Sequence, residues 1–537
     1  MALYSSAVFH EERQYVDEEL LFAAQGFGIC EAVFEYRPRH PEESILYRVV
    51  AENLESFLVR QQDRGRMVPR FVEKELRAFL DCGILDRGFV RVHCDSCGMD
   101  RVVPNSCKCR GFCLSCGGRR MADTAAHLVD RVFPEVPVRH WVLSVPFPLR
   151  YRLAYDSSLV RDVAQIFVRA VFSSIRRRAG VAASNRKARC GAVGFIQRFS
   201  DALNLDPHVH LMGIDGIYIE DGNGEPIFRR VGPPTDAEVA RVAKRVHRRV
   251  TRLMEQSGIG PRADPEEVDT LRQDEPLLAE LCSASIAGRV ATGPRAGKRI
   301  VRVGDELDCN DAVIKSGQCC ALIEGFSVHA GVCSPARDRI RLERLLRYAA
   351  RPPLSNERLS LLPDGRLLYK LKRRWSDGTT HVIYEPMELM ERLAALVPQP
   401  RFNITRYYEM LAPAATFRPS VDPEDKTAIV PTHPGCPAKI DTSKTDAAET
   451  ESKRGKKPRN YSWAQLLKRI FEFDVLCPRC GGKMRVLCAI NSQPPIQKIL
   501  ACLGLPSRAP PMAPDKAGVE RDCFDEVSSQ STLRLEL

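Results

Sequence analysis

The 537-residue sequence predicts an α+β fold. Segments with apolar side chains every three or four residues predict amphipathic helices. Short apolar runs joined by turn-forming residues predict antiparallel hairpins in the same chain. The length leaves room for three or four structural units, and the 44% of hydrophobic residues is typical of a globular protein.

The N-terminal part is predicted to be helical. Residues 44–82 carry apolar positions at helical spacing in two segments, split by RGRMVP, which indicates a pair of helices. We therefore assign residues 1–90 to a helical N-terminal region. The next stretch, residues 91–130, is dense in cysteine and is predicted to be a zinc-binding module.

The cysteines of this stretch have the spacing of metal ligands. Two Cys-x-x-Cys pairs with 15 residues between them are typical of a four-thiolate zinc site. Four thiolates leave no coordination position open for chemistry, so the expected zinc is structural. The predicted ligands are Cys94, Cys97, Cys113 and Cys116, and two further cysteines, Cys107 and Cys109, could replace one of them.

Two histidines in the central region suit a second kind of metal site. Residues 193–199 and 207–214 are apolar runs joined by SDALNLD, which predicts a hairpin. His208 and His210 then lie about 7 Å apart on one face, and a turn centred between residues 202 and 203 places Gln197 opposite His208. A glutamine oxygen with two imidazoles suits Mg²⁺ or Mn²⁺. His329 could replace Gln197, and a purely structural polar cluster is the alternative.

A tyrosine beside a helical stripe is the candidate nucleophile. The apolar positions Leu342, Leu345, Leu346 and Ala349 predict a helix that stops before a proline. Tyr348 lies next to this stripe, and the surrounding cations would hold a phosphodiester and favour the phenolate. Those cations are Arg344, Arg347 and Arg351. A role in packing is the alternative, and Tyr407 and Tyr408 are the competing tyrosines.

The C-terminal part is predicted to hold a linker and a small module. Residues 418–460 are rich in Pro, Thr, Ser, Lys and Asp, the composition of a flexible linker. Residues 461–537 contain one Cys-x-x-Cys pair, Cys477 and Cys480, which would form a zinc knuckle with further cysteines. An ordinary buried cysteine pair is the alternative.

The charge of the chain favours a polyanionic partner. Eighty Lys and Arg stand against 68 Asp and Glu, a formal net charge of +12, so nucleic acid is the first candidate. No run of 18 apolar residues and no signal-peptide pattern occurs, which predicts a cytoplasmic protein without a membrane partner. Twenty cysteines would stay reduced there and serve as metal ligands.

Several of these segments resemble a known family. FIQRF, LNLDPHVHLMGIDGIY, LERLLRYAARPPLSNERL and LKRRWSDGTTHVIYEPMELMERLAALVP are similar to rolling-circle transposases of the IS91 family, in the HUH endonuclease superfamily. The resemblance covers nearly the whole chain. It implies a central antiparallel sheet flanked by helices, a divalent metal at His208 and His210, and attack on DNA by Tyr348. Some relatives carry a second tyrosine where this chain has Arg344, which implies a single-tyrosine member.

The resemblance and the residues together predict a DNA transposase. Residues 131–417 would form an HUH-like catalytic domain that nicks and transfers single-stranded DNA, at element ends and target, through a 5′-phosphotyrosine in rolling-circle transposition. The alternative is a zinc-dependent DNA-binding regulator without catalysis. A zinc nucleobase deaminase is disfavoured, because no His-x-Glu followed by Pro-Cys-x-x-Cys occurs. The sequence makes no prediction of the oligomeric state.

Overall fold

The computed structural model describes residues 40–185, 187–258, 269–304, 318–415, 477, 479–482 and 484–514. The first 39 residues, the predicted linker at 418–460 and the ends of the predicted C-terminal module lie outside the described residues. Within them the chain is a mixed α+β structure, as the sequence predicts.

A six-stranded antiparallel sheet forms the centre of the molecule, with the strand order β14–β4–β5–β3–β10–β9. The predicted hairpin is confirmed as β4 and β5, and Gln197 pairs with His208 in the expected register. The strands are β3 (Val138–Ser144), β4 (Gly191–Phe199), β5 (Leu205–Ile214), β9 (Cys320–Ile323), β10 (Phe326–Ser334) and β14 (Thr405–Glu409).

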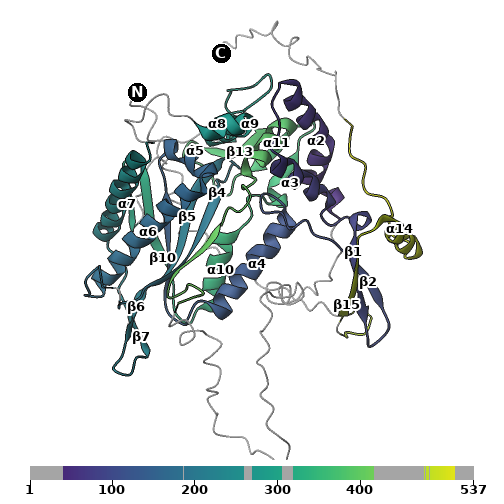
Figure 1. Cartoon of the computed structure of the whole chain (residues 1–537). Helices are drawn as coiled ribbons and strands as arrows, with labels where there is room; N and C mark the ends of the chain where they lie inside the picture. Colours follow the sequence, from purple (N-terminus) through teal and green to yellow (C-terminus); the bar gives the residue numbers. More distant parts are fainter. Residues whose placement is uncertain are drawn as a thin grey trace, which may run out of the picture.

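Helices cover both faces of this sheet (Figure 1). Helices α6 (Ser157–Arg178) and α7 (Asp236–Gln256) pack on one face, against side chains that include Val209 and Leu211. Helices α4 (Leu114–Arg131) and α10 (Arg339–Ala350) pack on the other face, against Met212 and Ile214. Because side chains alternate along a strand, the even-numbered residues of β5, the two histidines included, face the side of α10.

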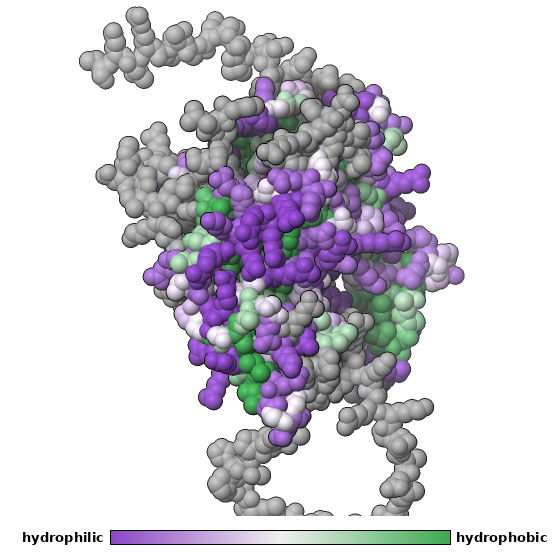
Figure 2. All heavy atoms as spheres, turned by 60° about the vertical axis from the view of Figure 1, so that its left-hand side comes forward, coloured by the Kyte–Doolittle hydropathy of each residue, from purple (hydrophilic) through white to green (hydrophobic). Residues whose placement is uncertain are grey.

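Helix α7 gives the α6 and α7 side of the molecule a basic surface. Its buried stripe packs on the sheet, and its outer side exposes cations at helical spacing. Figure 2 shows hydrophilic side chains gathered across this side. The exposed cations of α7 are Arg241, Lys244, Arg248 and Arg252.

A second core joins the N-terminal helices to later parts of the chain. The predicted helical pair is confirmed as α2 (Ile45–Asp63) and α3 (Arg70–Asp81), and α11 (Pro386–Leu396) packs in the same core. Other elements are α5 (Phe147–Tyr155), α8 (Thr270–Asp274), α9 (Pro276–Ile286), the hairpin β6 (Gly216–Glu220) and β7 (Pro226–Arg230), and a sheet of β11 (Leu359–Leu361), β12 (Leu367–Lys370), β13 (Thr379–Tyr384) and β8 (Val301–Gly304).

The predicted boundaries of the two cysteine modules differ from the structure. Strand β15 (Met484–Ile490) pairs with β1 (Phe89–Cys94), which also pairs with β2 (Asp100–Pro104). Helix α14 (Gln493–Cys502) packs on the same unit. A two-stranded hairpin has little stability alone, and the C-terminal strand supplies the third strand. Helix α4, expected inside the zinc module, carries Cys116 in its first turn and packs its later turns against α10.

Candidate functional site

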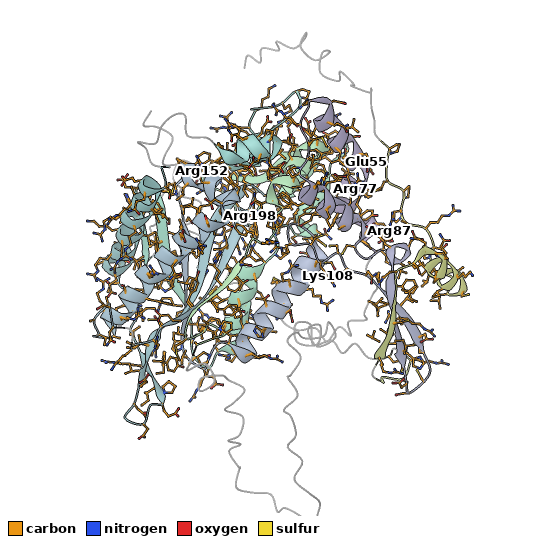
Figure 3. The ribbon with its side chains drawn as sticks, in the orientation of Figure 1. Glu55, Arg77, Arg87, Lys108, Arg152 and Arg198 are labelled. Carbon is orange, nitrogen blue, oxygen red and sulfur yellow. The ribbon has the colours of Figure 1, made fainter. Side chains whose placement is uncertain are left out.

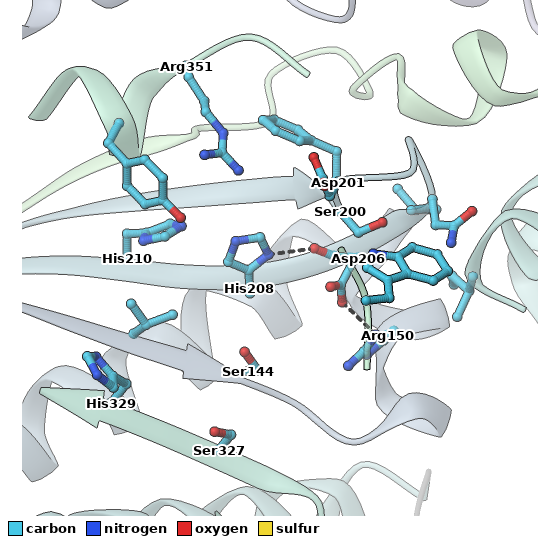
Figure 4. A pocket seen from close by; sticks show the side chains of 17 residues that line it. Ser144, Arg150, Ser200, Asp201, Asp206, His208, His210, Ser327, His329 and Arg351 are labelled. Carbon is cyan, nitrogen blue, oxygen red and sulfur yellow. Dashed lines mark hydrogen bonds and ion pairs between the residues drawn. The ribbon is translucent and has the colours of Figure 1, made fainter. Parts of the chain in front are cut away.

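Three strands of the central sheet place four histidines on the face that α10 covers. His208 and His210 come from β5, His140 from β3 and His329 from β10. The rings of His208 and His210 are 4.8 Å apart between centroids, and His140 Nε2 lies 2.7 Å from His210 Nδ1. Figure 4 shows His208, His210 and His329 around one pocket. The expected face of the histidine pair therefore contains a larger imidazole cluster.

Burial keeps His208, His210 and His140 neutral. Burial is the largest cause that lowers the pKa of both His208 and His210, and the pKa of His210 falls well below its ordinary value. Burial, and then repulsion from His329 and His208, lowers the pKa of His140 to about 3. Neutral imidazole is the form that binds metal ions.

The hydrogen bonds of the pair leave its outer nitrogens available to a metal ion. His208 Nδ1 donates to the carbonyl oxygen of Asp206 at 2.7 Å, which leaves the lone pair on Nε2. His210 Nε2 is buried and has no hydrogen-bond partner among the described residues. If His210 Nδ1 donates to His140, the same tautomer results. Two neutral imidazoles with directed lone pairs fit a divalent metal.

Helix α10 brings Tyr348 against this cluster. The Asp338 side chain caps the helix by accepting from the Arg341 N–H at 2.9 Å, and the predicted apolar stripe packs in the core shared with α4. The Tyr348 ring meets the His210 ring edge-on, with centroids 5.7 Å apart at 89°. Tyr348 lines the same pocket as His208, His210 and His329. The candidate nucleophile and the candidate metal ligands thus share one pocket.

The three arginines predicted around Tyr348 are not equivalent. The Arg351 guanidinium lies over the Tyr348 ring at 4.4 Å and lines the pocket. Arg347 instead pairs with Glu343 at 2.6 Å, one turn back on the helix, and Arg344 is exposed. Neither of them lines the pocket. Of the predicted set, Arg351 alone lies where it could meet a bound phosphate.

Gln197 contacts the tyrosine helix. Its Nε2 donates to the carbonyl oxygens of Tyr348 at 3.0 Å and Ala349 at 2.8 Å, which ties the end of α10 to β4. Its Oε1 is buried and accepts no hydrogen bond from the described residues. Gln197 does not line the pocket, whereas His329 does. No described His, Cys, Asp or Glu forms a compact three-ligand group with the histidine pair.

The cysteines form two groups of four, and these groups differ from the predicted set. Cys113 and Cys116 lie with two cysteines from earlier in the chain, Cys82 and Cys107. Cys94 and Cys97 instead lie with Cys477 and Cys480, from the far end of the chain. The prediction that one zinc site joins Cys94 and Cys97 to Cys113 and Cys116 is therefore wrong. The β1–β15 pairing is the physical reason, because it brings the last knuckle to the first.

Both cysteine groups have dimensions that suit zinc. In each group all four sulfur atoms lie within 4.8 Å of one another. Measured Sγ to Sγ distances are 3.5 Å for Cys94 to Cys480 and 3.7 Å for Cys113 to Cys82. A tetrahedron with Zn–S bonds of about 2.3 Å requires about 3.8 Å. The Lys108 N–H also points at the Cys116 sulfur at 3.2 Å, as amides do at metal knuckles.

Comparisons with known proteins give matches to transposases. Residues 50–145 match the model "Transposase zinc-binding domain", named for IS91, and residues 191–418 match the model "Putative transposase". The "Transposase for insertion sequence element IS801" of Pseudomonas savastanoi pv. phaseolicola is 23% identical over 340 residues, 62% of this chain and 68% of that protein. The chain belongs to the IS91 family of transposases. No solved structure gives a significant match.

The two matched regions cover the first cysteine group and most of the elements that form the pocket. The zinc-binding domain covers Cys82 to Cys116 but not the C-terminal knuckle, and the transposase model covers β4, β5, β10 and α10. None of the described helices is long and apolar enough to cross a membrane.

The competing tyrosines, Tyr407 and Tyr408, lie on the edge strand β14 and do not line the pocket.

Sequence reasoning missed three polar residues of this IS91-family site. His140 is one of only 11 histidines and begins the strand-like run HWVLSVP, a signal that could have been used. Arg150 and Asp206 form a buried ion pair at 2.8 Å in the pocket wall, visible in Figure 4. Asp206 precedes the histidine pair, but its partner lies 56 residues earlier, so no local pattern indicates the pair.

Proposed function

We propose that this transposase nicks and transfers single-stranded DNA through a 5′-phosphotyrosine at Tyr348, in rolling-circle transposition. One observation carries the proposal: the Tyr348 ring stands edge-on to His210, at 5.7 Å between centroids, in a pocket that also contains His208 and Arg351. A tyrosine can act as the nucleophile of covalent phosphodiester transfer, and a cation beside it can stabilise the charge that develops on the phosphate.

The chain's own residues suggest how the step proceeds. Tyr348 attacks the phosphorus as a phenolate, the bond to the 3′ oxygen breaks, and a 5′-phosphotyrosine and a free 3′-hydroxyl result. The Arg351 guanidinium favours the phenolate and the phosphate, because it is a fixed cation beside the ring. Gln197 holds the carbonyl end of α10 and so positions Tyr348. Arg344 stands one turn before Tyr348, so one chain supplies one nucleophile.

A bound Mg²⁺ or Mn²⁺ would neutralise charge on a non-bridging phosphate oxygen. His208 and His210 would hold it through their Nε2 atoms, with Gln197 Oε1 or His329 as the third ligand. His140 would act as a positioning residue, because its Nε2 lies 2.7 Å from His210 Nδ1 and, by accepting the proton of that nitrogen, would fix the ligating tautomer.

The cysteine groups and the basic surface would serve structure and binding. We assign one structural Zn²⁺ to Cys82, Cys107, Cys113 and Cys116, and a second to Cys94, Cys97, Cys477 and Cys480, because both groups have tetrahedral dimensions. The exposed cations of α7 would follow a DNA backbone through phosphate contacts.

The test is the covalent intermediate. Purified protein is incubated with Mg²⁺ and labelled single-stranded DNA from an element end, and the products are separated under denaturing conditions. We expect a protein–DNA adduct that survives denaturation and disappears with EDTA. The alternative, a zinc-dependent DNA-binding regulator, forbids such an adduct under any condition, so DNA binding without one would reject the proposal.

A further inference from the structure

A second pocket adjoins the pocket of Tyr348 and shares Phe199 and Arg351 with it. It lies between β4, the start of α4 and the end of α10, and Figure 3 labels Arg198, one of its lining residues. No Asp or Glu is among its described lining residues. Four arginines from separate parts of the chain line it: Arg110, Arg120, Arg198 and Arg351.

Two of these arginines form no close ion pair among the described residues and bind main-chain carbonyl oxygens instead. Arg110 donates to the carbonyl oxygens of Gln399 at 3.2 Å and Phe402 at 2.8 Å. Arg120 donates to two main-chain carbonyl oxygens of the zinc-binding domain, both at 3.1 Å. A main-chain carbonyl fixes the position of a guanidinium but carries no net charge. The two side chains are therefore held in place and remain cationic.

Arg198 is the most unusual member of the set. Its side chain is 6% exposed, its Nη2 donates to the Ala154 carbonyl oxygen at 2.9 Å, and its Nε and Nη1 have no hydrogen-bond partner among the described residues. Burial lowers its pKa to about 10, so it still carries its charge at neutral pH. The nearby Glu75 carboxylate accepts from the Gly111 N–H and attracts Arg198 through space, but it forms no hydrogen bond with Arg198 among the described residues. A buried cation with two unused donors is costly unless a ligand meets it.

Apolar side chains form part of the remaining wall of this pocket. Phe199, Pro352, Leu396 and Ile404 line it. Guanidinium groups bind phosphate oxygens with paired hydrogen bonds, and apolar or aromatic walls accept the face of an unpaired base. The pocket combines both features, as a site for one nucleotide of a single strand requires.

We propose that this arginine pocket binds a nucleotide of the DNA strand beside the phosphate that Tyr348 attacks. The inference rests on the proposed function, because that function places the scissile phosphate in the neighbouring pocket. Arg351 lines both pockets, so it would lie between the two phosphates of a strand that occupied them. The pocket fixes which phosphate reaches Tyr348, since a strand held at two successive positions cannot slide.

The test measures binding alone, in Tyr348→Phe protein. Fluorescence anisotropy gives the affinity for a 30-nucleotide thymidine strand between 50 and 200 mM salt. Arg120→Gln and Arg198→Met are compared with Arg119→Gln, a matched control at an exposed neighbour that does not line the pocket. We expect each pocket variant to bind about tenfold more weakly and to lose about 0.7 from the slope of log K against log salt, the value for one phosphate contact.

Each outcome has a defined reading. Pocket variants that bind like Arg119→Gln, with the same salt slope, would overturn the inference. If thermal melting shows that Arg198→Met does not fold, Arg120→Gln and Arg110→Gln decide. If the pocket variants bind more weakly and with less salt dependence, while protein that keeps Tyr348 never forms an adduct, the pocket stands and the proposed chemistry is rejected. If protein that keeps Tyr348 forms the adduct but the pocket variants keep the salt slope of Arg119→Gln, the proposed chemistry stands and the pocket inference is rejected.

Discussion

His140 makes a measurable contribution to the pH dependence of stability. Its pKa is about 3 in the folded protein and 6.5 ordinarily, because the imidazole is fully buried beside His329 and His208. A histidine whose pKa is lowered by folding binds fewer protons in the folded state than in the unfolded state. The contribution of His140 to the free energy of unfolding is therefore fully present above pH 6.5 and is lost as the pH falls below that value.

The size of this loss follows from the two pKa values. Between pH 8 and pH 5 the unfolded chain gains nearly one proton at this position, and the folded protein gains almost none. The free energy of unfolding should fall by about 2 kcal/mol through His140 alone. His140→Gln removes the titration but keeps an acceptor for the Nδ1–H of His210, which makes it the matched variant.

The assay is urea unfolding of both proteins at pH 8, 7, 6 and 5, followed by circular dichroism. The other titrating groups are common to the two proteins, so the difference between the curves isolates His140. We expect the wild-type protein to lose about 2 kcal/mol more than His140→Gln over this range. Parallel curves would refute the argument, because they would mean that His140 is not held neutral by its surroundings.

Three further predictions concern the metals and the C-terminal segment. Cys477→Ser and Cys82→Ser should each lower the zinc content by about one equivalent, and together by two, because the structure puts them in separate groups; a combined loss of only one would contradict this. His210→Ala should abolish cleavage yet keep DNA binding within about twofold, since the basic surface supplies most of the affinity; anisotropy and gel assays check this. Gln197→Ala should lower the rate of cleavage. It should also lower the free energy of unfolding by about 2 kcal/mol, because two hydrogen bonds are lost. If His329 is the third ligand, His329→Ala should lower cleavage alone.

Local patterns predicted the parts of the fold that depend on near neighbours. The β4 and β5 register was predictable because a turn of fixed centre and a period of two place Gln197 opposite His208. The buried stripe of α10 was predictable from spacing alone. The Arg347 and Glu343 pair also follows a local rule, four residues apart on a helix, and could have been anticipated.

Contacts between distant segments were not predictable in this way. The Cys97 and Cys477 sulfurs lie 3.5 Å apart although 380 residues separate them, and spacing within one segment favoured a different set of four. Likewise, His140 lies on β3 and His329 on β10, two strands that pair in the sheet although they are far apart in the sequence. The order of the strands in the sheet decides which distant residues come into contact, and a single sequence carries little information about that order.

The most direct test of the central claim is to locate the DNA on the protein. The adduct is trapped with labelled single-stranded DNA, digested with nuclease and protease, and analysed by mass spectrometry. We predict that the modified peptide contains Tyr348 and that Tyr348→Phe, with unchanged folding, zinc content and DNA binding, gives no adduct. A modified peptide that contains Tyr407 or Tyr408, or an adduct that persists in Tyr348→Phe, would contradict the account.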